Sequence, residues 1–182
     1  KKQTARQRSR WIQEVLERYE GALVRYTTRL TLDAEKARDI VQEGFLKLCD
    51  SDLTGRDHVG AWLYAVCRNL ALDMRRKEKR MNPLDEATLA AQPSGEPGPA
   101  AIAEKREQSS RAIRALDSLP ENQREVLRLK FQDGLSYREI STVTGHSVSN
   151  VGFLIHVGLK TIREQLQDPA SPAGHRSERR QS

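Results

Sequence analysis

Aromatic and basic residues gather in one stretch of this sequence, His58–Arg80, and their chemistry suits the binding of unpaired nucleic acid. Flat aromatic faces stack on bases, and cationic side chains contact the phosphate backbone. The candidate contacts for a single strand are Trp62, Tyr64, Arg68, Asn69, Arg75, Arg76, Lys79 and Arg80. The alternative interpretation is a core helix with a solvated basic end, and the stretch alone leaves both interpretations open.

The same stretch has the spacing of one long helix. Apolar residues at intervals of three and four predict a buried stripe made of Val59, Leu63, Val66, Leu70 and Met74. Two further stripes are Trp62, Asn69 and Arg76 along one edge, and Tyr64, Arg68, Arg75 and Lys79 along the opposite face. For Trp62, core packing is favoured over base stacking.

Composition and charge exclude several classes of protein. The formal net charge of +6 favours a polyanionic partner. No apolar run is long enough to span a membrane, so we expect no membrane insertion. The histidines and carboxylates form no metal cluster, nucleophile–base set or phosphate loop, so we expect no enzyme, no cofactor and no metal. Cys49 and Cys67 lack metal-binding spacing, which predicts two buried, unpaired thiols and a cytoplasmic location.

Three helices form the predicted first domain, residues 11–81, behind a flexible basic lead-in at residues 1–10. Helical spacing predicts the first helix at Trp11–Leu30. Asp33 is a plausible N-cap for the second helix, Ala34–Asp50. The buried face of this second helix is predicted to be Ala37, Ile40, Val41, Gly44, Phe45 and Leu48. A polar loop, Ser51–His58, then leads into the aromatic and basic helix.

Residues 82–101 carry prolines, glycines and only acidic charges, which predicts a flexible linker. A tail at residues 168–182, rich in Pro, Ser and Arg, is predicted to be disordered. Residues 102–167 have the pattern of a second helical domain, which begins with an amphipathic helix at Ile102–Leu116. We therefore predict an all-α chain of two small helical domains joined by a flexible acidic Pro/Gly-rich linker.

The second domain contains the pattern of a helix-turn-helix. After the helix Glu121–Phe131, whose buried residues are predicted to be Val126, Leu127 and Phe131, Asp133-Gly134 breaks the chain. Ser136 then opens a short helix with a capping box, and Gly145 closes it. Ser147 can cap the final helix, Val148–Leu166. A short helix, a turn and a longer helix are typical of a helix-turn-helix.

The ordered chain resembles a bacterial RNA polymerase sigma factor of the extracytoplasmic-function group (group IV, sigma-70-like). Three segments carry the resemblance: DAEKARDIVQEGFLKL, AWLYAVCRNLALDMRRKEKR and LDSLPENQREVLRLKFQDGLSYREIS. They are similar to the family's core-polymerase-binding segment, its promoter-melting segment and the start of its upstream-element-reading domain. The resemblance implies a sigma region 2-like domain at residues 11–81 and a sigma region 4-like domain at residues 102–167.

The resemblance also implies a function. Such a chain binds core RNA polymerase and directs promoter recognition, melting and transcription initiation. The implied partners are core RNA polymerase and promoter DNA, both duplex and melted, and an anti-sigma factor is a further partner that the resemblance admits. The positions that match the polymerase-docking residues of the family are Asp39, Gln42, Glu43 and Phe45.

The residues themselves agree with this assignment in part. Asp39, Gln42 and Glu43 lie away from the predicted buried stripe and are available to a partner, although a solvated face would look the same. Phe45 is expected in the core, whatever else it contacts. Asn69 matches a position that lines the pocket for a flipped base, with the loop Ser51–His58 forming the rest. An amide suits that task because it offers donors and an acceptor to a base edge.

The last helix departs from the family's pattern. Gly152, Leu154 and Val157 stand where basic side chains are commonly found. The predicted inward stripe is Val151, Ile155, Leu159 and Ile162, and the predicted contacts with duplex DNA are Lys130, Arg138, Ser147, Ser149, Asn150, Phe153, His156, Lys160 and Arg163. Phe153 beside Val157 forms an apolar patch, which either contacts thymine methyl groups or docks a regulator or the first domain.

Two classes of function remain in view. The first is the promoter-recognition subunit of RNA polymerase. The second is a stand-alone helix-turn-helix regulator that binds duplex DNA as a dimer. The second helix and the aromatic and basic helix favour the first class, because a stand-alone regulator needs neither.

Overall fold

The computed structural model describes residues 2–53, 57–81 and 111–167, and within these ranges every element is a helix. The prediction of an all-α chain is confirmed for this part of the chain. By their backbone contacts the helices form two compact units, α1, α2, α3 and α6 in one and α5 and α7 in the other. None of the described helices is long and apolar enough to cross a membrane. The predicted linker and tail, and residues 102–110 of the predicted helix, lie outside the described residues.

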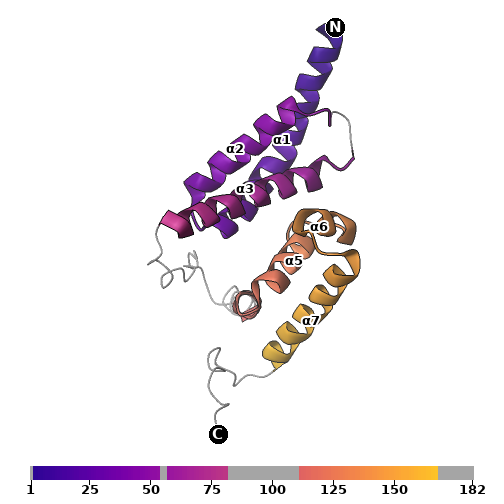
Figure 1. The fold of residues 1–182 in the computed structure, drawn as a ribbon. Coiled ribbons are helices and arrows are strands. Elements are labelled where there is room, and N and C mark those ends of the chain that lie inside the picture. Colours follow the sequence, from indigo (N-terminus) through magenta and orange to yellow (C-terminus); the bar gives the residue numbers. More distant parts are fainter. Residues whose placement is uncertain (1, 54–56, 82–110, 168–182) are drawn as a thin grey trace, which may run out of the picture. The chain divides into compact units, whose positions relative to one another are not determined.

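Helix α1 (Lys2–Thr31) is longer than the sequence predicted, because residues 2–10 of the expected flexible lead-in are helical. Its inward face carries Val15, Leu23 and Tyr26, which are 6%, 0% and 2% exposed. The helix ends at a sharp corner where Leu32 has a φ of 58° and donates its amide to the carbonyl of Thr28 at 2.8 Å. This left-handed residue reverses the chain so that α2 can return along α1 (Figure 1).

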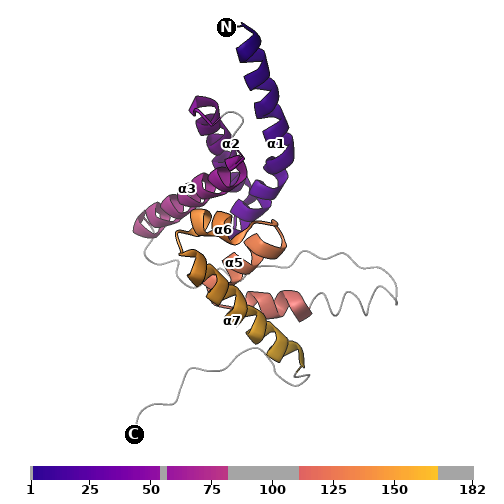
Figure 2. The ribbon, with the colours of Figure 1, turned by 90° about the vertical axis from the view of Figure 1, so that its right-hand side faces the viewer.

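Helix α2 (Ala34–Asp50) begins where the sequence predicted. The Asp33 carboxylate accepts the amides of Glu35 and Lys36 at 2.9 and 3.1 Å, which are two of the donors that a helix start leaves unpaired. The predicted buried face is confirmed in full, since the buried residues are Ala37, Ile40, Val41, Gly44, Phe45 and Leu48. Helices α1, α2 and α3 contact one another in all three pairings (Figure 2).

Helix α3 (Val59–Met81) buries Val59 and Leu63 of the predicted stripe but not the other three residues. The buried residues are Val59, Gly60, Ala61, Leu63, Tyr64, Cys67 and Ala71, whereas Val66, Leu70 and Met74 are half-buried. The reason is the size of the side chains. A Cβ on Gly60 would lie 2.8 Å from the ring of Tyr19, so small residues let α3 approach its neighbours closely and define its inward face.

In the second unit, α5 (Glu121–Phe131) packs against α7 (Val148–Gln167). Val126 and Leu127 are buried as predicted, but Phe131 is 62% exposed, and Leu129 takes its place in the core at 0%. On α7, Val151 and Ile155 are buried as predicted. The prediction is wrong for Leu159, which is 38% exposed, because Leu154 and Gly158 face inward instead.

Helix α6 (Tyr137–Thr144) has both predicted ends. The Ser136 hydroxyl accepts the amide of Glu139 at 3.3 Å, and the Glu139 carboxylate accepts the amide of Ser136 at 2.7 Å, which completes the capping box. Gly145 closes the helix with a φ of 77°, a conformation that a residue with a Cβ adopts only at a cost. After the short turn, the Ser147 hydroxyl accepts the amide of Asn150 at 3.2 Å and caps α7, as predicted.

Candidate nucleic-acid interface

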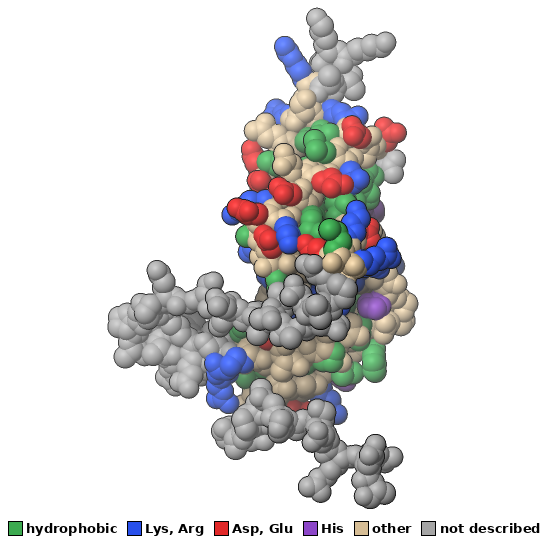
Figure 3. All heavy atoms as spheres, turned by 60° about the vertical axis from the view of Figure 1, so that its left-hand side comes forward, with side chains coloured by type: hydrophobic (Ala, Val, Ile, Leu, Met, Phe, Trp, Pro, Cys, Tyr) green, Lys and Arg blue, Asp and Glu red, His purple; other side chains and the backbone are tan. Residues whose placement is uncertain are grey.

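The outward face of α2 is polar with one large apolar side chain. Asp39, Gln42 and Glu43 are exposed, and they share this face with Leu46, which is 59% exposed. Phe45 is 7% exposed and lies in the core, as predicted. Leu46 was not among the predicted contacts, although its spacing from Asp39 and Gln42 places it on the same face of the helix. On the face of the first unit that Figure 3 shows, acidic side chains lie among basic and hydrophobic ones.

The second half of α3 carries the cationic candidates. Asn69, Arg76, Lys79 and Arg80 are exposed, whereas Arg68 and Arg75 are half-buried. The Arg76 guanidinium pairs with the carboxylate of Asp73 one turn earlier, at 2.9 Å. Asn69 therefore lies on the surface of a helix whose charge becomes positive toward its end, as the sequence predicted.

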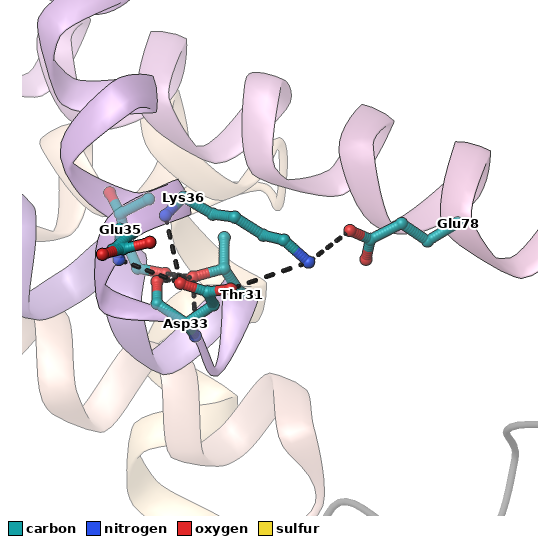
Figure 4. Close-up of polar contacts among 6 residues, drawn as sticks. Thr31, Asp33, Glu35, Lys36 and Glu78 are labelled. Atoms are coloured by element: carbon teal, nitrogen blue, oxygen red, sulfur yellow. Dashed lines mark hydrogen bonds and ion pairs between the residues drawn. The ribbon is translucent and has the colours of Figure 1, made fainter.

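Glu78, an acidic residue near the end of this cationic segment, is paired with the start of α2. The Lys36 ammonium lies 2.7 Å from the Glu78 carboxylate and 3.7 Å from that of Asp33 (Figure 4). The bond with Glu78 raises the pKa of Lys36. The backbone amide of Lys36 is the main cause that lowers the pKa of Asp33 below its ordinary value of 3.8. This cluster joins α2 and α3 and neutralises the one negative charge near the end of α3.

Two aromatic candidates on α3 differ in position. Trp62 is half-buried at the edge of the helix. Tyr64 is 2% exposed and lies against Tyr26 of α1 with a distance of 5.1 Å between the ring centroids, so the prediction that Tyr64 contacts a single strand is wrong. Tyr64 was predicted on the outer face because the apolar stripe was placed along Val66, Leu70 and Met74, whereas the inward face also includes Gly60, Cys67 and Ala71.

The two cysteines also differ. Cys67 is buried, and this burial raises the pKa of its thiol to about 12. Cys49 is exposed, so the prediction of two buried thiols holds only for Cys67. Both cysteines are free, as predicted.

The loop that follows α2 is held by α1 at its first residue. The Arg8 guanidinium nitrogen Nη2 donates to the carbonyl oxygens of Cys49 and Ser51, at 2.7 and 2.6 Å. The Ser51 hydroxyl donates to the carbonyl of Leu48 at 2.9 Å and lies 3.4 Å from the amide of Leu53. No sequence signal pointed to Arg8, because 41 residues separate it from the nearer of its two partners.

The outward face of α7 carries most of the predicted duplex contacts. Its exposed members are Ser149, Asn150, Phe153, His156, Lys160 and Arg163, with Ser147 exposed just before the helix and Val157 half-buried. Phe153 is 62% exposed, the most exposed large apolar side chain on this helix. Outside α7, Arg138 is exposed on α6 and Lys130 is half-buried on α5. Leu154 is 5% exposed, so this position belongs to the core and is not available for a basic side chain.

Comparison with known proteins gives two family matches. The family described as Sigma-70 region 2 matches residues 15–81, and that described as Sigma-70, region 4 matches residues 109–162. The first match covers most of α1 and all of α2 and α3. The second covers α5, α6 and most of α7.

Individual relatives carry the same description. The chain is 29% identical over 134 residues to the RNA polymerase sigma factor SigV of Bacillus subtilis (strain 168), which covers 72% of this chain and 76% of that protein. It is 32% identical over 129 residues to the ECF RNA polymerase sigma factor EcfG of Rhodopseudomonas palustris (strain TIE-1), covering 69% of this chain and 68% of that one. For two other relatives the match covers less of the relative's length, 60% and 64%.

A solved structure shares the fold. It is the sigma factor RpoE from Bartonella quintana, crystallised with the anti-sigma factor NepR, and it matches with a TM-score of 0.64 at 22% identity over 86% of this chain and 97% of that one. The sequence relatives, the two region matches and the helical bundle with its cationic third helix all agree. The chain belongs to the extracytoplasmic-function group of bacterial RNA polymerase sigma factors.

Proposed function

We propose that this sigma factor binds its partners through three separate surfaces and catalyses no reaction. The outward face of α2 docks on core RNA polymerase. The cationic half of α3, with the loop before it, holds the melted promoter strand. The outward face of α7 contacts the duplex upstream. The single observation that carries this proposal is that one bundle exposes an acidic, partly apolar helix face on α2 and a cationic helix end on α3.

The outward face of α2 has the composition of a protein interface. A large apolar side chain, Leu46, is 59% exposed among polar neighbours, and such a residue contributes most when a partner buries it. Leu46→Ala should weaken the affinity for core polymerase by about tenfold, which corresponds to the removal of a buried leucine side chain at roughly 1.5 kcal/mol. Leu32→Ala is the control, because Leu32 is 45% exposed at the corner outside α2. Equal affinities for both variants would remove Leu46 from the docking face.

The α3 surface suits a single strand because it combines an exposed amide with cations. Asn69 is exposed, so its amide can reach the edge of an extruded base, while Lys79 and Arg80 lie further along the same helix toward its end. Trp62 is half-buried, so part of its side chain stays accessible to a base.

The test of this surface is Asn69→Ala in the reconstituted holoenzyme. We expect slower open-complex formation on duplex promoter and a weaker preference for the flipped base, with unchanged polymerase affinity. A pre-melted template should restore the rate of opening but not the base preference. Unchanged opening together with an unchanged base preference would remove Asn69 from the site.

For α7 we propose contact with duplex DNA through short polar and apolar groups. Asn150 is suited to adenine, and Phe153 can meet thymine methyl groups in the major groove. Few cations accompany them, and Lys160 lies 3.9 Å from the carboxylate of Glu164. Since each neutralised phosphate contributes a log–log salt slope of about −0.9, the salt dependence of duplex binding by this helix should be shallow.

The competing role for Phe153 is docking of a regulator, and an anti-sigma factor is the third partner that we propose. Phe153→Ala separates the two roles when it is assayed by transcription with holoenzyme alone and by binding to a cognate anti-sigma factor. Lost transcription with the partner retained supports contact with DNA. Normal transcription with the partner lost supports docking.

The stand-alone regulator that binds duplex DNA is not favoured, because the family matches and the relatives are those of sigma factors. Run-off transcription with purified core polymerase separates the two mechanisms. We expect the free chain to bind duplex promoter weakly and the holoenzyme to bind it well, because two small sites act together only when both are held in place. Tight, sequence-specific duplex binding by the free chain would favour the regulator.

A further inference from the structure

Arg8 of α1 bonds the end of α2 and the first residue of the loop that follows it. One nitrogen of its guanidinium, Nη2, donates to the carbonyls of both Cys49 and Ser51, at 2.7 and 2.6 Å. Arg8 is half-buried, although it lies in a stretch of α1 that is otherwise exposed. Neither family match includes Arg8, since the first begins at residue 15.

The two accepting carbonyls explain why an arginine fits here. The last carbonyls of a helix have no partner within the helix, and they form the negative end of its dipole. A cationic donor satisfies them with charge-assisted hydrogen bonds, which are roughly twice as strong as neutral ones. Arg8 therefore closes α2 from outside, in the place that a C-terminal glycine motif takes in other helices.

The contact also fixes the direction in which the chain leaves the helix. Ser51 is the C-cap, with extended backbone angles of φ −89° and ψ 161°, and its carbonyl already belongs to the loop. Its amide and its hydroxyl both bond the carbonyl of Leu48, at 3.1 and 2.9 Å. Arg8 thus holds the chain on both sides of the exit, at Cys49 inside the helix and at Ser51 beyond it.

We propose that Arg8 is a positioning residue for base reading in the melted promoter: it fixes the first residues of the loop between α2 and α3, Ser51–Leu53, in the orientation that the base-holding pocket requires. This inference rests on the proposed function of that loop and of Asn69. Arg8 acts through the loop and does not itself contact the base.

The alternative is that Arg8 only stabilises the bundle. The two explanations differ in what the loss of Arg8 changes. A purely structural role lowers the unfolding temperature and lowers transcription from all promoter variants in equal proportion. A positioning role changes the ratio between the cognate base and a substituted base at the flipped position, because a loop whose start is loose discriminates less.

The experiment compares three variants of the full chain in holoenzyme: Arg8→Met, Arg8→Lys and the control Arg10→Met. Arg10 lies nearby on α1 with its side chain 84% exposed, and it pairs with Glu14 of the same helix at 3.3 Å. Open-complex formation is measured on the cognate promoter and on promoters with each substituted base at the flipped position. Hydrogen exchange of the peptide that contains Leu53 is measured on the free chains.

We expect Arg8→Met to reduce the base-preference ratio by about threefold to tenfold, which corresponds to about 0.7–1.4 kcal/mol at 1.4 kcal/mol per tenfold change. Arg8→Lys, which keeps the charge and a donor, should recover part of the ratio, and Arg10→Met should match the unmodified chain. The Leu53 peptide should exchange faster in Arg8→Met only.

Two results would overturn the proposal. One is an unchanged ratio in Arg8→Met, whether or not the exchange of the Leu53 peptide changes. The other is an equal loss on every promoter, which assigns Arg8 a structural role alone. Asn69→Ala, measured in the same series, separates this failure from that of the proposed function. If Asn69→Ala lowers the ratio and Arg8→Met does not, the role of Arg8 fails and the pocket stands; if neither lowers it, the pocket itself is refuted.

Discussion

Gly158 of α7 packs closely against Leu127 of α5. Replacing Gly158 is a direct test of this packing. A Cβ at this position would lie 2.8 Å from Cδ1 of Leu127 and 3.5 Å from Cδ1 of Leu119. Both leucines are buried, at 2% and 4% exposure, so neither can swing into solvent. Gly158→Ala therefore adds a methyl group where the core has no room for it.

Two opposing effects set the magnitude. Alanine is favoured over glycine within a helix by about 1 kcal/mol, because glycine loses more backbone entropy on folding. Against this, ordinary van der Waals contacts begin near 3.4 Å. The added methyl group would overlap the leucine by about 0.6 Å, and overpacking of that kind costs roughly 1–3 kcal/mol. We expect a net destabilisation of about 1 kcal/mol.

The matched control is Gly21→Ala in α1, where the nearest atom to an added Cβ is the flexible end of Arg25 at 3.4 Å. This variant should be stabilised by about 1 kcal/mol through helix propensity alone. Both tryptophans of the chain, Trp11 and Trp62, lie in α1 and α3, so their fluorescence follows the first unit while circular dichroism follows both. Gly21→Ala should raise the fluorescence transition, and Gly158→Ala should lower the dichroism transition without changing the fluorescence.

A second variant tests the physical reason. Leu127→Val removes one methylene from the side chain that the new methyl group would meet. The double variant Gly158→Ala/Leu127→Val should therefore be less destabilised than the sum of the single variants, by about 1 kcal/mol, as expected for residues in contact. If Gly158→Ala instead stabilises the chain as Gly21→Ala does, the close approach of α5 and α7 is refuted.

Three further predictions concern charged and titrating groups of the first unit. Glu78→Gln removes the negative charge nearest the end of α3 and breaks the ion pair with Lys36. Holoenzyme with this variant should bind melted promoter more tightly at low salt, and binding titrations at high salt should show no difference. The pKa of Asp33 is lowered in the folded chain, so its carboxylate contributes to stability above the ordinary pKa of 3.8. This contribution is lost as the pH falls through the folded pKa. The thermal unfolding temperature of Asp33→Asn should therefore depend less on pH in the acid range. The raised pKa of Cys67, about 12, keeps it a buried thiol, so an alkylating reagent at pH 8 should modify Cys49 alone in the native chain, and mass spectrometry locates the label.

Helix caps and the buried face of α2 could be predicted from sequence because they depend on local chemistry. Asp33, Ser136 and Gly145 act within a few residues of themselves, and the apolar spacing of α2 is unbroken. The inward faces of α3 and α7 could not be predicted in the same way. There the closest contacts are made by residues such as Gly60 and Gly158, whose lack of a side chain carries no signal in an apolar pattern.

The exposure of the candidate site residues was predicted correctly where local spacing was enough to place them. Residues placed by helical spacing, such as Asp39 and Asn69, are exposed as predicted, whereas Tyr64 was assigned to the wrong face together with the error in the stripe of α3. The role of Arg8 could not be predicted for a different reason. Its two acceptors are backbone carbonyls, which any residue type supplies, so no side chain in the sequence marks them.

The charges of the first unit explain how one small bundle can serve two partners of opposite character. Asp39 and Glu43 make the exposed face of α2 unattractive to phosphate, so nucleic acid is directed away from it and toward the basic end of α3. The ion pair between Lys36 and Glu78 joins these two helices, in addition to their packing in the core. Under the proposed function, docking on α2 therefore also fixes the orientation of α3. A free chain that binds DNA weakly would then gain a fixed position on the melted strand once polymerase holds α2.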